Sequence, residues 1–133
     1  KDGIAYKEYA IADTNEVQSV TTAAAGECDV LYIPTDNTLA SVTETVYNVV
    51  APAKIPVIAG EEGICNGCGV ATLSISYYDL GYATGEMAYE ILAEGADITT
   101  MDVRYAPNVT KKYNAKICEE LGITVPDDYV AIQ

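Results

Sequence analysis

Two short polar segments hold the side chains of this chain that are best suited to chemistry. The first is Thr35-Asp36-Asn37-Thr38 and the second is Gly60-Glu61-Glu62-Gly63. A carboxylate can hold a ligand ammonium through a charge-assisted hydrogen bond, and the Asn amide and Thr hydroxyls can donate and accept. Backbone N–H groups at a helix start can receive a ligand carboxylate. These residue types therefore favour the binding of a small polar ligand.

Each segment also has a plainer interpretation, which the pattern alone leaves open. Asp36 is well placed to cap a following helix, as a loop between a strand and a helix requires. Glu61 and Glu62 fit an ordinary solvated loop equally well. A general acid and base formed by these two carboxylates is disfavoured, because adjacent side chains usually point apart.

The four cysteines also permit several interpretations. Cys65 and Cys68 form a Cys-Asn-Gly-Cys turn, which we predict to be a loop because of its glycines. The pair is a candidate disulfide, with a reduced pair and redox or metal chemistry as alternatives. We predict no metal site, since the chain has no His and no second ligand pair. Cys28 and Cys118 have apolar neighbours and are typical of small core residues.

The composition indicates one acidic, globular domain. The 133 residues suffice for a single core, and 20 acidic against 7 basic residues give a net charge of -13. Such a surface repels phosphate backbones, so no nucleic-acid partner is expected. The sequence has no apolar run of about 18 residues that would cross a membrane. It begins without a signal peptide, which leaves the compartment open.

The lack of His also disfavours catalysis. It removes the Ser-His and Cys-His nucleophile systems and the commonest metal ligand. The sequence contains neither a G-x-G-x-x-G motif nor a phosphate-binding loop, so no cofactor is expected. We therefore predict that the chain is not an enzyme.

The hydrophobic periodicity predicts strands that alternate with helices. Strands are expected over residues 6–12, 30–33, 55–59, 70–75 and 101–105, and helices over 17–25, 38–50, 76–92 and 111–121. Ser76, with Asp79 three residues later, matches a capping box, and Gly122 is a candidate helix C-cap. This order implies an α/β fold: a parallel sheet with helices on both faces. Ligands of such sheets bind beyond the carboxyl ends of the strands, where both polar segments lie.

At this point the residues resemble a known family. Residues 30–37, Val-Leu-Tyr-Ile-Pro-Thr-Asp-Asn, are similar to a signature of ABC transporter substrate-binding proteins of the tryptophan/tyrosine-binding type. Residues 55–63 and 69–88 resemble the strand and acidic loop that follow and a later strand-helix signature. The matches are collinear and together cover roughly residues 15–130.

The resemblance implies part of a type I periplasmic-binding-protein lobe, which is flavodoxin-like. Two lobes joined by three crossings would close on a small ligand, and residues 1–133 would be the C-terminal portion. About 1–69 and 98–133 would belong to the second lobe, and about 70–97 would cross to the first. The cleft would be faced by Thr35, Asp36 and Asn37, with Glu61 or Glu62 close by.

The function that the resemblance implies is uptake of an amino acid-like solute, with an aromatic amino acid favoured. The partner would be an ABC permease, and the protein would be extracytoplasmic, either periplasmic or lipid-anchored at the cell surface. A family member is roughly twice this length, so an excised piece could dimerise to hide apolar surface. The alternatives are the effector-binding domain of a transcription regulator with the same fold and a small flavodoxin-like enzyme.

Overall fold

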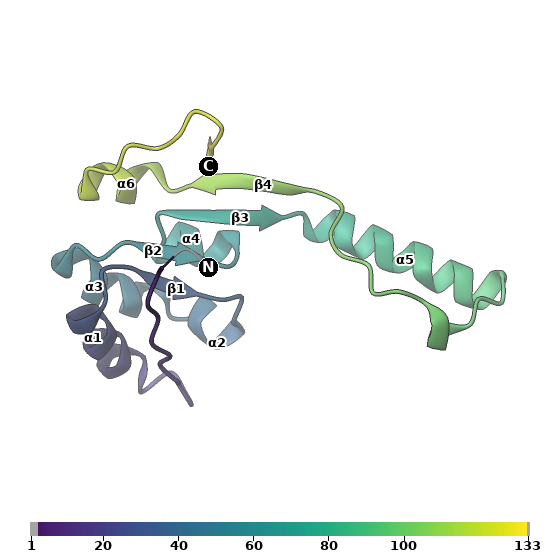
Figure 1. Ribbon diagram of the computed structural model, residues 1–133, viewed down its shortest axis with the longest axis horizontal. Coiled ribbons are helices and arrows are strands. Elements are labelled where there is room, and N and C mark those ends of the chain that lie inside the picture. Colours follow the sequence, from purple (N-terminus) through teal and green to yellow (C-terminus); the bar gives the residue numbers. More distant parts are fainter. Residues whose placement is uncertain (1–2, 133) are drawn as a thin grey trace.

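The computed structural model describes residues 3–132, which form one mixed sheet with helices around it (Figure 1). The strands are β1 (Leu31–Ile33), β2 (Val57–Ala59), β3 (Ala71–Ile75), β4 (Val109–Tyr113) and β5 (Val130–Ala131). The helices are α1 (Val17–Glu27), α2 (Asn37–Ala40), α3 (Thr43–Ala53), α4 (Glu62–Cys68), α5 (Tyr77–Ala93), α6 (Ala115–Leu121) and the 3-10 turn η1 (Ile98–Thr100).

The sheet has the order β1-β2-β3-β4-β5 and is mostly parallel. The pairs β1–β2, β2–β3 and β4–β5 are parallel, whereas β4 runs antiparallel to β3 along five residue pairs. The predicted α/β class is therefore confirmed, whereas the sheet, which was expected to be parallel throughout, is parallel except at the β3–β4 pair. The antiparallel pair arises because the chain leaves the sheet through β3, follows α5 outward and returns through β4 (Figure 1).

Most of the core lies on one face of the sheet. Ile33, Val57 and Ala59 point to this face and pack against Val17 of α1, Val46 and Val50 of α3 and Ile64 of α4. The alternate strand residues point the other way, and Tyr32 and Leu73 are 67% and 56% exposed. A smaller cluster forms where α6 packs against Val70. In the described chain the second face is thus only partly covered.

The helix α5 and the segment that returns from it project from the rest of the molecule as an arm (Figure 1). Ser76 caps α5 by accepting a hydrogen bond from the Asp79 amide at 3.1 Å, as the capping box predicted. Arg104 donates to both carboxylate oxygens of Glu90, at 2.7 and 2.6 Å, and holds the return segment beside the helix. None of the α5 residues that the structure describes is buried.

Three predicted elements are wrong in position. Residues 6–12 form no strand among the described residues, because a strand needs a partner for its backbone groups and none lies beside them. The strand expected over 101–105 lies instead at β4, whose residues are in register with β3. The helix expected from residue 111 begins at Ala115, since the Asn114 side chain accepts from the Ile117 amide and caps it.

Candidate ligand-binding site

The end of β1 supplies the first polar group of the site. After Ile33 the chain turns outward, and Thr35, Asp36 and Asn37 are all exposed. Asp36 is the N-cap of α2, and its Oδ1 accepts a hydrogen bond from the Leu39 amide at 2.8 Å. The plainer interpretation of Asp36 is therefore realised. It leaves a ligand role open, because an ionised carboxylate has about four lone-pair sites and one of them serves the cap.

The end of β2 supplies the second polar group. Glu61 is the N-cap of α4, and its carboxylate accepts from the amides of Gly63, at 2.8 Å, and Ile64. The expectation of a loop through residues 60–68 is wrong. The carboxylate of Glu61 satisfies two of the four free N–H groups of the helix start, which lets α4 begin directly after the strand.

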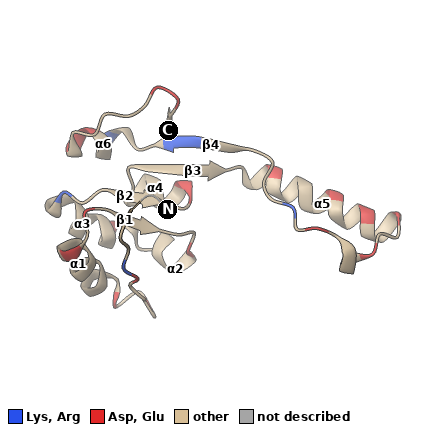
Figure 2. Cartoon of the chain, in the orientation of Figure 1, with Lys and Arg blue, Asp and Glu red and all other residues tan. Residues whose placement is uncertain are grey.

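Glu62 is held by the two strands that lead to and from the arm. Its Oε2 accepts from Lys112 Nζ of β4 at 2.7 Å and from Ser74 Oγ of β3 at 2.9 Å. The hydrogen bond from Lys112, followed by that from Ser74, lowers the pKa of the Glu62 carboxyl below its usual value. Figure 2 shows the basic stretch of β4 beside the acidic start of α4.

The two strand ends are joined to each other. The Thr35 hydroxyl donates to the Gly60 carbonyl at 3.2 Å, and the Gly60 amide donates to the Ile33 carbonyl at 2.7 Å. These residues follow neighbouring parallel strands, so they meet at the same edge of the sheet, where α/β sheets bind ligands. The structure thus places the predicted residues of the two segments at one edge.

Sequence reasoning missed Lys112 and Ser74 as members of this cluster. Lys112 lies 50 positions from Glu62 along the chain, and no local pattern connects the two. The available signal was a lysine in a segment that can form a strand. We expected the strand at residues 101–105 instead, so Lys112 was not assigned to the sheet. Ser74 was read only as part of a strand, although its side chain is buried and faces α4.

The cysteines of α4 are buried, free thiols. Cys65 and Cys68 are 0% and 1% exposed, so the candidate disulfide is not formed in this structure. Burial, with smaller contributions from Cys118 and Cys68, raises the pKa of Cys65 to about 12, and burial alone raises that of Cys68 to about 12. Thiols of this kind are poor nucleophiles. Within residues 3–132 the structure groups no three metal-ligating side chains.

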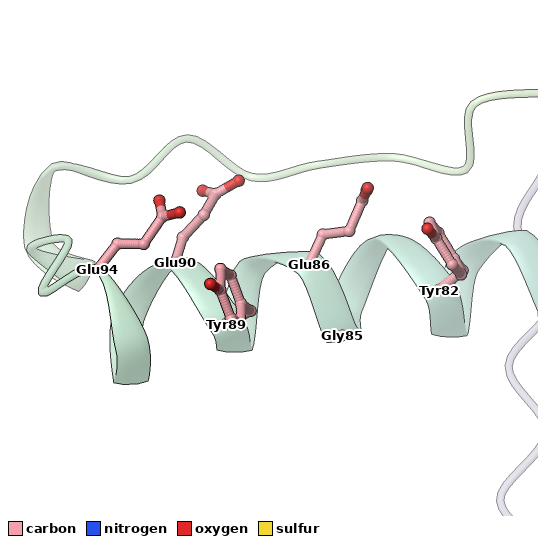
Figure 3. Close-up of a pocket in the computed structure, with 6 residues that line it drawn as sticks. All are labelled: Tyr82, Gly85, Glu86, Tyr89, Glu90 and Glu94. Carbon is pink, nitrogen blue, oxygen red and sulfur yellow. The ribbon is translucent and has the colours of Figure 1, made fainter.

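One hollow of the surface lies on the arm and not at this edge of the sheet. It measures about 450 Å³ and is lined by Tyr82, Gly85, Glu86, Tyr89, Glu90 and Glu94 (Figure 3). In Figure 3 the three glutamates reach toward the return segment. A small-molecule pocket needs apolar walls and a few convergent polar groups. A stripe on one helix lacks this, so we place the candidate site at the strand ends.

The arrangement at the strand ends can do simple polar chemistry. Asp36 and Glu61 are carboxylates whose unused lone pairs can receive a ligand ammonium. Asn37 and Thr35 can donate and accept beside them.

No helix among residues 3–132 is both long and apolar enough for a membrane crossing.

Comparison with known proteins places the chain among solute-binding proteins. The model of the ABC transporter substrate binding protein family matches residues 1–132. A tyrosine-binding protein of Clostridioides difficile is 40% identical over 100 residues, which cover 71% of this chain and 29% of that protein.

Solved structures agree with this match. A ligand-free, open substrate-binding protein with adhesive properties from Clostridium difficile is 36% identical, with a TM-score of 0.72 over 99% of this chain and 46% of that one. A domain from Streptococcus pneumonia, solved in complex with L-Trp, is 30% identical, with a TM-score of 0.83 over 98% of this chain and 46% of that one. The chain therefore spans about half the length of these structures, and less of the curated relative.

Proposed function

Since the chain belongs to the family of ABC transporter substrate-binding proteins, we propose that it is the C-terminal portion of the solute-binding component of an ABC importer. In this proposal the sheet with α1–α4 and α6 belongs to the second lobe, and the chain crosses to the first lobe after β3, within the segment of about 70–97. A small solute binds between the lobes without catalysis. The partner is a membrane permease, and the protein works outside the cytoplasm, in the periplasm or anchored to lipid.

The observation that carries the proposal is the junction of two polar strand ends. The contact between Thr35 and Gly60 brings the start of α2 and the start of α4 to one edge of the sheet. That edge offers Asp36 and Glu61 for an ammonium and Asn37 for hydrogen bonds. Because both carboxylates also hold helix starts, their positions are set before any ligand arrives, which lowers the entropic cost of binding.

We propose that the ligand is an aromatic amino acid. Two similar proteins support this ligand class, one described as tyrosine-binding and one solved with L-Trp. An amino acid carries an ammonium that suits the carboxylates of this edge. The aromatic part would contact residues of the other lobe or of the arm.

We further propose that the 133 residues alone form a homodimer, which would cover the exposed sheet residues Tyr32 and Leu73.

The test is ligand-dependent thermal stability of the full-length protein against a panel of amino acids and other small solutes. Ligand at about 100 times its Kd should stabilise the folded protein by about 2.7 kcal/mol. The shift should appear with tyrosine, tryptophan or phenylalanine and be lost in Asp36→Ala. The matched control is Asp29→Ala, which removes an exposed carboxylate at the other end of β1 from Asp36. The absence of a shift with every solute would overturn the amino-acid assignment.

A further inference from the structure

The carboxylate of Glu62 is tied to two strands at once, an arrangement that we call the Glu62 anchor. Its carboxylate accepts from two donors on two strands, Ser74 of β3 and Lys112 of β4. The Ser74 side chain is buried, and the Lys112 side chain is only 28% exposed. A charge-assisted hydrogen bond shielded in this way is stronger than a fully solvated ion pair.

The neighbouring lysine shows the contrast. Lys111 pairs with Asp128, and these side chains are 48% and 59% exposed. Because side chains alternate along a strand, Lys111 points to the opposite face of the sheet from Lys112. The register agrees, since Lys111 lies beside the exposed Leu73 and Lys112 beside the buried Thr72. Lys111 is therefore a suitable control for Lys112, because it carries the same charge one position away but does not contact Glu62.

Glu62 is linked to the candidate site along the backbone, through the two residues that precede it. Glu62 follows Glu61, which caps α4, and Glu61 follows Gly60, which accepts the hydrogen bond from Thr35. Adjacent carboxylates repel each other, and a helix of seven residues is marginal on its own. The cation of Lys112 offsets that repulsion and fixes the first turn of α4 against β3 and β4.

We propose that Lys112 is a positioning residue of the ligand-binding site: through Glu62 it holds the segment from Gly60 to Glu62 in place and ties it to the strand that returns from the arm. The consequence for ligand affinity rests on the proposed function. The positioning itself does not, because the anchor is present without ligand. If β4 moves relative to β3 when the arm moves, the anchor transmits that movement to the strand end that faces the ligand.

The first experiment measures hydrogen exchange of the ligand-free, full-length protein. The amides of Gly63 and Ile64 donate to Glu61, so their exchange reports whether the start of α4 is held. In Lys112→Gln they should exchange about tenfold faster, since the shorter, neutral side chain removes the cation that pairs with Glu62. Lys111→Gln is the matched control and should leave them within about twofold. Equal exchange in the two variants overturns the proposal, whether or not a ligand is known.

The second experiment measures the Kd of the amino acid that stabilises the wild-type protein. Lys112→Gln should weaken binding by about tenfold, whereas Lys112→Arg, which keeps the cation, should bind within about threefold of wild type. The exchanged pair Glu62→Lys with Lys112→Glu should recover part of the loss. If Lys112→Gln loosens the amides but leaves Kd unchanged, the role in ligand binding is wrong. If the wild type binds no solute, the proposed function fails and the exchange result still decides the anchor.

Discussion

The Thr35 hydroxyl donates a hydrogen bond to the carbonyl oxygen of Gly60 at 3.2 Å, so the ends of β1 and β2 touch. A Cβ on residue 60 would lie 2.6 Å from the Thr35 amide nitrogen and 2.8 Å from the Pro34 carbonyl carbon. Both atoms belong to the backbone, which cannot turn away as a flexible side chain can. The close approach of the two strand ends therefore depends on glycine at this position.

Gly60→Ala should consequently destabilise the fold and separate the two strand ends. We expect a loss of about 1–3 kcal/mol, because the backbone must shift to admit the methyl group. Chemical denaturation of the variant and of wild type measures this difference. Gly26→Ala is the control: nothing lies within 4 Å of its Cβ, so alanine should stabilise α1 by about 0.5–1 kcal/mol. Equal effects of the two substitutions would contradict the contact.

Substitutions of Asp36 should separate helix capping from ligand binding. Asn also caps helices well, so Asp36→Asn should keep most of the stability that Asp36→Ala loses, about 1 kcal/mol. The amide has no negative charge to attract a ligand ammonium. Both variants should therefore show a reduced ligand-induced thermal shift, whereas only Asp36→Ala should unfold at a lower temperature without ligand. A full ligand shift in Asp36→Asn would show that the charge of Asp36 plays no part in binding.

Acid should weaken the anchor of Glu62. The hydrogen bonds from Lys112 and Ser74 lower the pKa of this carboxyl from the usual 4.5, so the ionised form is favoured in the folded state. The stability that it contributes is present above that usual value and is lost as the pH falls through the lower, folded-state value. The difference in unfolding temperature between wild type and Glu62→Gln should thus shrink between about pH 6 and pH 3. A difference that is constant across this range would argue against the anchor.

The buried thiols should be unreactive in the folded protein. At pH 8 the raised pKa of Cys65 and Cys68, about 12 for each, leaves few thiolates, and burial blocks access. Labelling should reach Cys28 first, since it is only partly buried. After unfolding without reductant, all four cysteines should react. Two reactive thiols in place of four would indicate a disulfide.

Local patterns predicted the parts of this fold that depend on near neighbours in the chain. The Ser76 cap and the left-handed Gly122 C-cap, with φ at 67°, are where the sequence placed them. Such features depend on backbone groups three or four positions away, so a short stretch of sequence specifies them. The same reasoning predicted that Asp36 precedes a helix.

Patterns failed where a strand depends on a distant partner. Residues 6–12 alternate as a strand does, yet their backbone groups have no neighbouring strand among the described residues. The acidic segment and the turn at Cys65 and Cys68 were expected to form a loop, although Glu61 caps α4, which spans Glu62–Cys68. Burial of Ile64, which is 0% exposed, holds that short helix against the sheet, and burial is not visible in local composition.

By itself the sequence determined the α/β class, the family and the two polar segments, because periodicity and motifs are properties of consecutive residues. Only the tertiary structure decided that Thr35 touches Gly60 and that Lys112 holds Glu62. These contacts join positions 25 and 50 residues apart, and they form because strands far apart in the chain lie side by side. The register of those strands selects which side chains face each other, and that register is set by packing across the whole sheet.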